Sequence, residues 1–355
     1  MECIVSKSGR IMTHTPSLKA VQEEIDLMEK IRQEYLDDLE RASICDGLFV
    51  CRPAGEWIER EKQRPDPVEL WKTLWHEHEV SCLFADSNMG KSIYAVQIAE
   101  HVARRGMKVL YFDFELAAKQ FQLRYSDPAT GNAYRFSPNL LRVEFGDTKM
   151  PPTVAGMVER IEMAARETDS RILIIDNLTW ICNNSEQGDA AGELMQALVT
   201  LKRSMGLSIL CLAHTPKRAA TSPLTQNSLA GSKRIANFMD SMFAIGRDMT
   251  CQPQGRYVKQ IKVRSAECLY GDEHVIRYRL EREGEMLKFV ENGFGREADL
   301  LLAGDDERSD RDRRIAEMAR QGMTQRQIAD EVGVSKSLVA KIMLKNGPGL
   351  SPDAA

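Results

Sequence analysis

The stretch from Cys82 to Ser92 has the residue types and spacing of a loop that binds the phosphates of a nucleotide. A short apolar run precedes it, and Gly90-Lys91-Ser92 opens a helical run that continues to Arg104. In such a loop, backbone N–H groups and the positive end of the helix dipole converge on phosphate oxygens. Lys91 would add a mobile positive charge, and the Ser92 hydroxyl would ligate Mg²⁺. The residues expected to contact ATP are Ala85, Asp86, Ser87, Asn88, Met89, Gly90, Lys91, Ser92 and Ile93.

One position departs from the usual pattern of this loop, which has glycine where this sequence has Ala85. If the position requires a positive φ, alanine costs about 1 kcal/mol there, and otherwise the cost is small. The alternative interpretation of the whole stretch is an incidental turn.

Three further polar residues end apolar runs of the sequence. A buried carboxylate at Asp176 is costly unless it serves an ion or an N–H donor, so we expect it to face Mg²⁺. Glu115 would face the γ-phosphate across the carboxyl edge of a parallel sheet, where ligands bind in open α/β folds. His214 could hydrogen-bond the same phosphate. The structural alternatives are a capping Asp, a solvent-exposed Glu and a core His.

In these residues the chain resembles the RecA-like ATPases, over roughly residues 70–290. Within that superfamily it is similar to hexameric helicases of the DnaB and plasmid RepA type, and most of all to RepA-like ATPases of plasmids and mobilisable elements. The resemblance implies that Glu115 orients the attacking water, that Asp176 is a Mg²⁺ partner and that His214 senses the γ-phosphate. It also implies that Arg124 lies near the base or sugar, the alternative being an arginine on a helix surface.

Lys262 and Arg264 share one face of a strand expected at 256–264, and two adjacent cations favour an anion. The resemblance implies that this pair reaches the ATP site of a neighbouring subunit. Arg264 would then be an arginine finger acting in trans, which predicts a homo-oligomer, either a ring such as a hexamer or a filament. A solvated edge strand is the alternative.

In such a ring, the loops 177–190 and 215–231 would line a central channel. The second loop carries Lys217 and Arg218, followed by Lys233, which suits contacts with DNA phosphates. The first carries Glu186 and Asp189, which does not. Passage of DNA through the ring is therefore an open question.

Strands and helices alternate from Val80 to about Asn292, which predicts an α/β fold with a mainly parallel sheet and helices on both faces. After Ser241 short strands follow one another, which predicts an antiparallel extension of the sheet. Trp71 and Trp75 are expected on one side of a short helix. The expected strands are 109–114, 140–145, 171–176, 207–213, 241–246, 256–264, 274–280 and 286–290, and the expected helices of the core are 93–104, 154–166 and 190–205.

The length of 355 residues predicts two or three domains. A net charge of −4 with 28% charged residues does not by itself indicate nucleic acid or a membrane. The sequence has no apolar run of roughly 18 residues and no signal-peptide pattern at its start. Its eight cysteines are dispersed without Cys-x-x-Cys, so free thiols in a reducing cytoplasm are expected, with no membrane partner.

Four parts are expected along the chain. Residues 1–69 read as a helix over 17–42, either packed on the protein or serving oligomerisation, and an irregular linker from residue 47. Residues 70–295 form the RecA-like core. Residues 296–312 read as a charged linker. Residues 313–355 form a small all-α domain and a tail.

The C-terminal segment resembles the helix-turn-helix of recombinases and transcription regulators. Helices are expected at 314–320 and 325–332 and after Ser335, with Ala329 where two helices cross and Gly333 at the turn. Residues 307–345 hold nine Lys/Arg against six Asp/Glu. A helical packing module is the alternative. The residues expected to contact DNA here are Ser335, Lys336, Ser337 and Lys341.

These features favour an ATP-hydrolysing, DNA-associated, oligomeric ATPase with Mg²⁺ as cofactor, acting as a replication or mobilisation motor of the helicase type. The competing hypothesis is a DNA-binding regulator of a mobile element, in which ATP switches assembly and no strand is separated.

Overall fold

The computed structural model divides into two units, Met1–Asp66 and Pro67–Ala355. In the first unit, residues 26–30 and 32–33 are helical, and they precede the short strands β1 (Ser43–Cys45) and β2 (Phe49–Val50) and the helix α2 (Ala54–Glu61). The remainder of the helix expected over 17–42 lies outside the described residues. The structure describes residues 26–30, 32–33, 43–45, 49–146, 153–183, 190–216, 218–219, 221–229, 232–251, 253–301 and 305–346.

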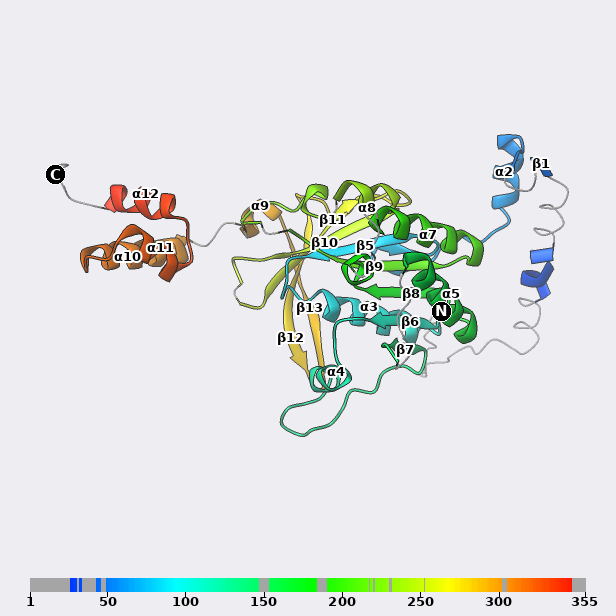
Figure 1. Cartoon of the computed structure of the whole chain (residues 1–355), viewed down its shortest axis with the longest axis horizontal. Helices are drawn as coiled ribbons and strands as arrows, with labels where there is room; N and C mark the ends of the chain where they lie inside the picture. The colour runs from blue at the N-terminus through cyan, green and yellow to red at the C-terminus, as the bar shows by residue number, and fades with distance from the viewer. Residues whose placement is uncertain are drawn as a thin grey trace, which may run out of the picture. The chain divides into compact units, whose positions relative to one another are not determined.

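A mixed sheet forms the body of the second unit (Figure 1). From one edge to the other its strands are β13 (Met286–Gly295), β12 (Val275–Glu283), β11 (Gly255–Lys262), β10 (Ser241–Arg247), β5 (Val80–Ala85), β9 (Ser208–His214), β8 (Ile172–Asp176), β6 (Val109–Asp113) and β7 (Leu140–Val143). The strands from β10 to β7 run parallel, and β11, β12 and β13 continue the sheet antiparallel. The predicted α/β fold with a mainly parallel sheet and an antiparallel extension is therefore confirmed.

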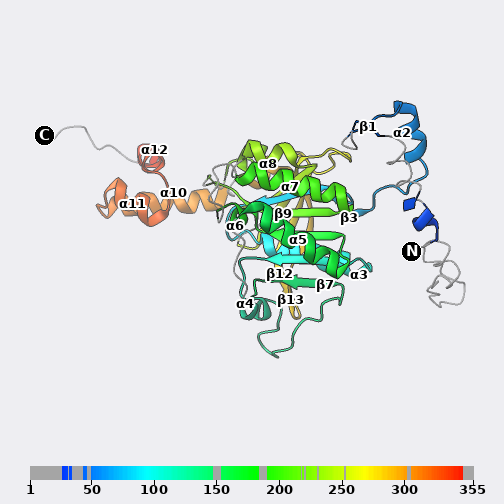
Figure 2. The ribbon, with the colours of Figure 1, turned by 45° about the vertical axis from the view of Figure 1, so that its right-hand side comes forward.

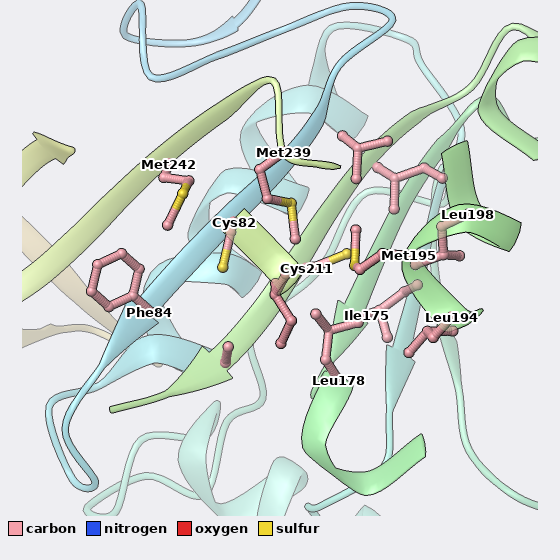
Figure 3. Close-up of a cluster of buried hydrophobic side chains, with 14 of the residues drawn as sticks. Cys82, Phe84, Ile175, Leu178, Leu194, Met195, Leu198, Cys211, Met239 and Met242 are labelled. Atoms are coloured by element: carbon pink, nitrogen blue, oxygen red, sulfur yellow. The ribbon is translucent and has the colours of Figure 1, made fainter. Parts of the chain in front are cut away.

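Every residue of β5, β6 and β8 is buried, because helices cover both faces of the parallel part. One face packs against α5 (Val154–Thr168), α6 (Leu178–Asn183), α7 (Ala190–Met205) and α8 (Ser232–Phe238), and α5 and α7 run side by side there (Figure 2). The core on this face brings Cys82 and Cys211 of the central strands against Leu194, Met195 and Leu198 of α7 (Figure 3).

The opposite face packs against α3 (Lys91–Arg104), which follows β5 directly. Tyr94 of α3 contacts the rings of Tyr278 and Phe289 on β12 and β13. The side-chain amide of Gln97 pairs with both backbone groups of Phe289, at 3.0 and 2.8 Å. The antiparallel extension is thus anchored on the helix that begins at the phosphate loop.

Three local expectations differ from the structure. Trp71 and Trp75 lie on a hairpin, β3 (Glu69–Trp71) and β4 (Trp75–His76), rather than on a helix, because the turn between them uses positive φ at Lys72 and Thr73. The segment expected to be an irregular linker contains α2. The segment 296–312, expected to be a charged linker, contains α9 (Glu297–Leu301) and the start of α10 (Asp305–Arg320). Glu297, Leu300 and Leu301 of α9 are buried. The charged composition of the segment 296–312 gave no indication of this burial.

The C-terminal segment folds as α10, α11 (Gln325–Val332) and α12 (Lys336–Asn346) around its own small core. Thr324 caps α11, and Gly333 ends it with φ of 71°. The Ser335 hydroxyl accepts a hydrogen bond from the Leu338 N–H at the start of α12. The core side chains are Ile315, Ile328, Ala329, Val339 and Ile342. No helix in the described part of the chain is long and apolar enough to cross a membrane.

Candidate nucleotide site

The strand order brings the predicted polar residues to one edge of the sheet. Strand β9 lies between β5 and β8, with His214 in register with Ala85. Strand β6 lies on the other side of β8, with Asp113 in register with Asp176. Because parallel strands end at the same edge, the residues that close β5, β6, β8 and β9 meet where the phosphate loop begins.

The phosphate loop needs no glycine at its first position. Ala85 is the last, fully buried residue of β5, and its φ is not positive. Positive φ falls instead at Asn88 (63°) and Gly90 (93°), residue types that tolerate it. A Cβ at Gly90 would lie 3.1 Å from the ring of Phe289, a tight contact that adds to the preference for glycine set by the positive φ. The departure at Ala85 therefore costs little.

Lys91 is the centre of the site. Its side chain is buried, and its ammonium donates to the carbonyl oxygens of Ala85 and Asp86 at 3.1 and 3.4 Å. The same ammonium lies 3.0 Å from Nδ1 of His214. Burial lowers the pKa of Lys91, while the carboxylates of Asp176, Glu115 and Asp86 oppose that shift.

His214 connects the lysine to Glu115. With Nδ1 accepting from the Lys91 ammonium, Nε2 carries the proton and donates to Oε1 of Glu115 at 3.3 Å. The amide of Asn177 also donates to Glu115, and its nitrogen lies 3.1 Å from Nε2 of His214. The side chain of Glu115 is 44% exposed, so its carboxylate is both held by protein donors and open to water.

Asp113 fixes the turn that presents Glu115. Its Oδ1 accepts from the N–H groups of Glu115 and Leu116 at 3.3 and 2.9 Å. Its Oδ2 accepts from Nε of Arg142 at 2.9 Å, and Arg142 also donates to the Leu116 carbonyl. Sequence reasoning missed both Asp113 and Arg142, although Asp113 stands two residues before Glu115 at the end of an apolar run.

Asp176 is buried beside the loop, 1% exposed. Its Oδ2 accepts a 2.7 Å hydrogen bond from the hydroxyl of Tyr111. Burial raises the pKa of Asp176 to about 6, against hydrogen bonds from Ser92 and Tyr111 that lower it. A carboxylate and a serine hydroxyl next to one another are oxygen donors of the kind that Mg²⁺ prefers. No cluster of three or more His, Cys, Asp or Glu suited to a metal occurs among the described residues.

The segment after His214 is tied to the phosphate loop. The Thr215 hydroxyl donates to Oδ1 of Asp86, and Nε of Arg218 lies 3.3 Å from Oδ2 of the same carboxylate. Arg218 also donates to the carbonyls of Ser222 and Pro223, and its side chain is 11% exposed. Arg218, expected to contact DNA, therefore has intramolecular partners around the nucleotide loop. Lys217 lies outside the described residues.

Lys262 and Arg264 lie at the opposite end of the sheet. Lys262 is in register with Met242, near the start of β10, whereas the phosphate loop follows the end of the parallel β5. Lys262 donates to the carbonyls of Ala236 and Met239 at 2.9 and 2.7 Å, and Arg264 pairs with Asp240 at 2.8 Å. Neither side chain can serve the ATP site of its own chain.

The remaining predicted residues lie elsewhere. Arg124 is half-buried and ends the helix α4 (Ala118–Arg124), in the segment after β6. In the C-terminal helices, the residues expected to contact DNA are exposed, and two of them begin or precede α12. They are Ser335, Lys336, Ser337 and Lys341.

Comparisons with known proteins gave one family match. Residues 50–220 match the model of a family described as an AAA domain. The match supports an ATPase domain in this part of the chain. The match ends just beyond His214. It therefore includes the phosphate loop, Glu115 and Asp176.

Two solved structures are similar at low identity. One is a KaiC-like protein from Pyrococcus horikoshii, with 14% identity and a TM-score of 0.46, covering 61% of this chain and 91% of that one. The other is the flagellar accessory protein FlaH from Methanocaldococcus jannaschii, with 15% identity and a TM-score of 0.44, covering 61% and 90%. A search of the curated proteins found no match.

Proposed function

We propose that this chain hydrolyses ATP with Mg²⁺ and acts as an oligomeric, DNA-associated motor of the helicase type. The observation that carries the proposal is the contact of Lys91, His214 and Glu115 at the end of the phosphate loop, with the buried Asp176 beside it. A lysine for the phosphates, a carboxylate for water and a polar group between them are the parts that phosphoryl transfer needs.

Each side chain has a distinct task in this proposal. Lys91 binds the β- and γ-phosphates, leaving the carbonyls that it contacts now. Glu115 orients the attacking water, and Asn177 holds its carboxylate through an amide donor. His214 contacts both Lys91 and Glu115, so it is placed to sense the γ-phosphate. Ser92 and Asp176 would hold Mg²⁺, which neutralises charge on the phosphates when bound.

The positive charge that stabilises the transition state of ATP hydrolysis is proposed to come from a second copy of this chain. Arg264, with Lys262 beside it, lies too far along the sheet to act within its own chain. An arginine supplied in trans would make hydrolysis depend on assembly. In a ring such as a hexamer, each Arg264 would reach the phosphate loop of the next subunit.

Contact with DNA is proposed for α10–α12, whose arrangement supports a helix-turn-helix. A capped α11, a glycine at the turn and an exposed, basic start of α12 suit insertion of α12 into the major groove. The expected division into an N-terminal part, an ATPase core and a C-terminal DNA-binding domain is retained in this proposal, without the separate linker at 296–312.

The test of the proposal is ATP turnover and duplex unwinding by the purified protein, with Lys91→Ala as the inactive control. We expect the wild type to hydrolyse ATP in the presence of Mg²⁺ and Lys91→Ala to be inactive. We also expect strand separation to require ATP hydrolysis. ATP at 100 times its Kd should stabilise the wild type by about 2.7 kcal/mol and the variant not at all. Turnover that survives Lys91→Ala would exclude this site.

A regulator that binds DNA without separating strands is the second candidate. It is favoured by one observation: Arg218, a predicted channel cation, is paired with Asp86 and two carbonyls. In that case DNA contacts fall to α12 alone. ATP-dependent binding of a specific duplex without unwinding would support this candidate over the first.

A further inference from the structure

Arg256 is a buried cation beside the phosphate loop that the proposed mechanism does not use. Its side chain belongs to β11, two strands from β5, and the residue is 6% exposed. Its Nε donates to the carbonyl oxygen of Met89 at 3.2 Å. Its Nη1 donates to the carbonyls of Pro253 and Gly255 at 2.9 and 2.8 Å. Within the described part of the chain, the guanidinium thus donates to carbonyl oxygens and forms no ion pair with a carboxylate.

The bond to Met89 constrains the next peptide N–H. The Met89–Gly90 peptide is trans, so its C=O and N–H point in opposite directions. Because the carbonyl points to the buried Arg256, the Gly90 N–H points to the other side of the loop. No hydrogen bond in the described part of the chain uses this N–H, whereas the Gly90 carbonyl accepts from Tyr94 at the first turn of α3.

Described residues on either side of Arg256 hold its backbone in place. The N–H of Asp248, after β10, bonds to the carbonyl of Gly255, which precedes Arg256, at 3.2 Å. A Cβ at Gly255 would lie 2.4 Å from the carbonyl oxygen of Cys251, so only glycine fits. Asp248 is held in turn by Arg277 at 2.9 Å. A donor on a fixed turn can hold a loop peptide in one orientation.

We infer that Arg256 is a positioning residue for the nucleotide's phosphates, aiming the Gly90 N–H into the cradle through the Met89 carbonyl. This inference rests on the proposed ATP-binding function of the loop. The cation also polarises the peptide that it holds, which strengthens the N–H as a donor to an anion. The ligand class is any polyphosphate, because the Gly90 N–H would contact phosphate and neither base nor sugar.

The experiment compares Arg256→Lys and Arg256→Gln with Arg247→Lys, the control. Arg247 is paired in register with Arg256 on β10, so its substitution alters a neighbouring cation without touching the Met89 carbonyl. Equilibrium affinity is measured for Mg-ATP and for inorganic tripolyphosphate, together with KM, kcat and the Tm of the nucleotide-free protein.

We expect both Arg256 variants to bind ATP and tripolyphosphate about 10-fold more weakly or worse, as for loss of a charge-assisted hydrogen bond. KM for ATP should rise by a similar factor, while kcat changes less than about threefold, because the N–H binds ground and transition states alike. Arg247→Lys should leave all values near wild type.

Equal affinity of Arg256→Gln and wild type for tripolyphosphate would overturn the inference, because this variant removes the charge that holds the Met89 carbonyl. An equal loss in Arg247→Lys would overturn it as well. A lower Tm with unchanged affinity would also overturn it, because Arg256 would then only hold the turn. These outcomes are distinct from failure of the proposed function, in which the wild type itself binds neither ATP nor tripolyphosphate.

Discussion

At the scale of single residues, the site is a chain of direct contacts from Lys91 through His214 to Glu115. Each member comes from a different part of the fold, and two carboxylates of the site are held by neighbours that sequence reasoning did not single out. Asn177 and Asp113 serve Glu115, and Tyr111 serves Asp176. The chemistry proposed for the site thus depends on residues whose own role is orientation.

Glu115→Gln separates binding from hydrolysis. The amide keeps the shape and the contact with water but cannot serve as a base, so turnover should fall by about 10² or more with ATP affinity nearly unchanged. Single-turnover hydrolysis and equilibrium ATP binding measure the two quantities. If affinity collapses while the bound fraction is hydrolysed at the normal rate, Glu115 is not the base.

Asp176→Asn should stabilise the nucleotide-free protein above neutral pH. Burial raises the pKa of Asp176 to about 6, so the folded state holds this proton more tightly than the unfolded state does. The contribution of Asp176 to stability is therefore present below about pH 4 and is lost as pH rises through about 6. Asp176→Asn has no carboxyl to ionise and so keeps its stability as pH rises. Its free energy of unfolding at about pH 8 should exceed that of the wild type by on the order of 2 kcal/mol.

The measurement is the free energy of unfolding of both proteins between about pH 4 and pH 8, without nucleotide. The two curves should converge at the acid end. A constant difference across the range would mean that the Asp176 carboxyl does not titrate in it. ATP turnover should nevertheless fall in the variant, because the residue proposed to face Mg²⁺ has lost its charge.

At the scale of elements, most of the core was predictable because its signals are local. Continuous apolar runs marked β6, β8 and β9, and Thr324 and Gly333 marked the ends of α11. The hairpin of Trp71 and Trp75 was missed, since two tryptophans four residues apart fit a helix equally well. The helix α9 was missed because Glu297 is a buried charge, stabilised by the distant Lys259 and Tyr257.

The site was predictable only in part, because some of its residues carry a local signal in the sequence and others do not. Residues that end strands, such as Glu115 and His214, stand out in the sequence. Strand pairing brings other partners to the site, such as Arg142 on β7 and Arg256 on β11. No local sequence pattern identifies these residues, because their contacts form only when distant strands pair. Arg218 shows the reverse case, in which a loop cation looks free in the sequence but contacts Asp86.

The exposed start of α12 is the element proposed to contact DNA. Lys336→Ala and Lys341→Ala should each flatten the slope of log affinity against log salt by about one unit, because each would remove one phosphate neutralised by the protein. Duplex affinity is measured over a salt series for each variant, with Arg320→Ala of α10 as a control cation on another helix. Parallel curves for all proteins would assign α10–α12 to packing rather than to DNA.

At the scale of the whole molecule, the position of Lys262 and Arg264 is the reason for proposing that hydrolysis depends on an assembly. Both lie at the end of the sheet opposite the phosphate loop, so the transition-state charge must come from a neighbour if it comes from this pair. The pair with Asp240 is largely exposed on the arginine side, where Arg264 is 57% exposed, and such a contact is readily exchanged for an anion.

Arg264→Ala should leave ATP affinity nearly intact and abolish hydrolysis. Mixing this variant with Lys91→Ala should restore part of the activity, because some interfaces then join an intact loop to an intact arginine. Turnover of the mixture is compared with that of each variant alone at equal total concentration. Normal hydrolysis by a monomeric Arg264→Ala protein would remove the assembly model.

The carboxylate of Asp86 stands in a loop that must receive a polyanion, and Thr215 and Arg218 cover it. A bare carboxylate at that entrance would repel ATP before any contact formed, by on the order of 1 kcal/mol at about 4 Å in water. Arg218 is thus placed as a counterion of the Asp86 carboxylate. Its removal should lower the association rate of ATP more than it raises the dissociation rate. Rapid-mixing kinetics of Arg218→Ala would show this as a reduced association rate that recovers as salt rises, since screening replaces the missing charge.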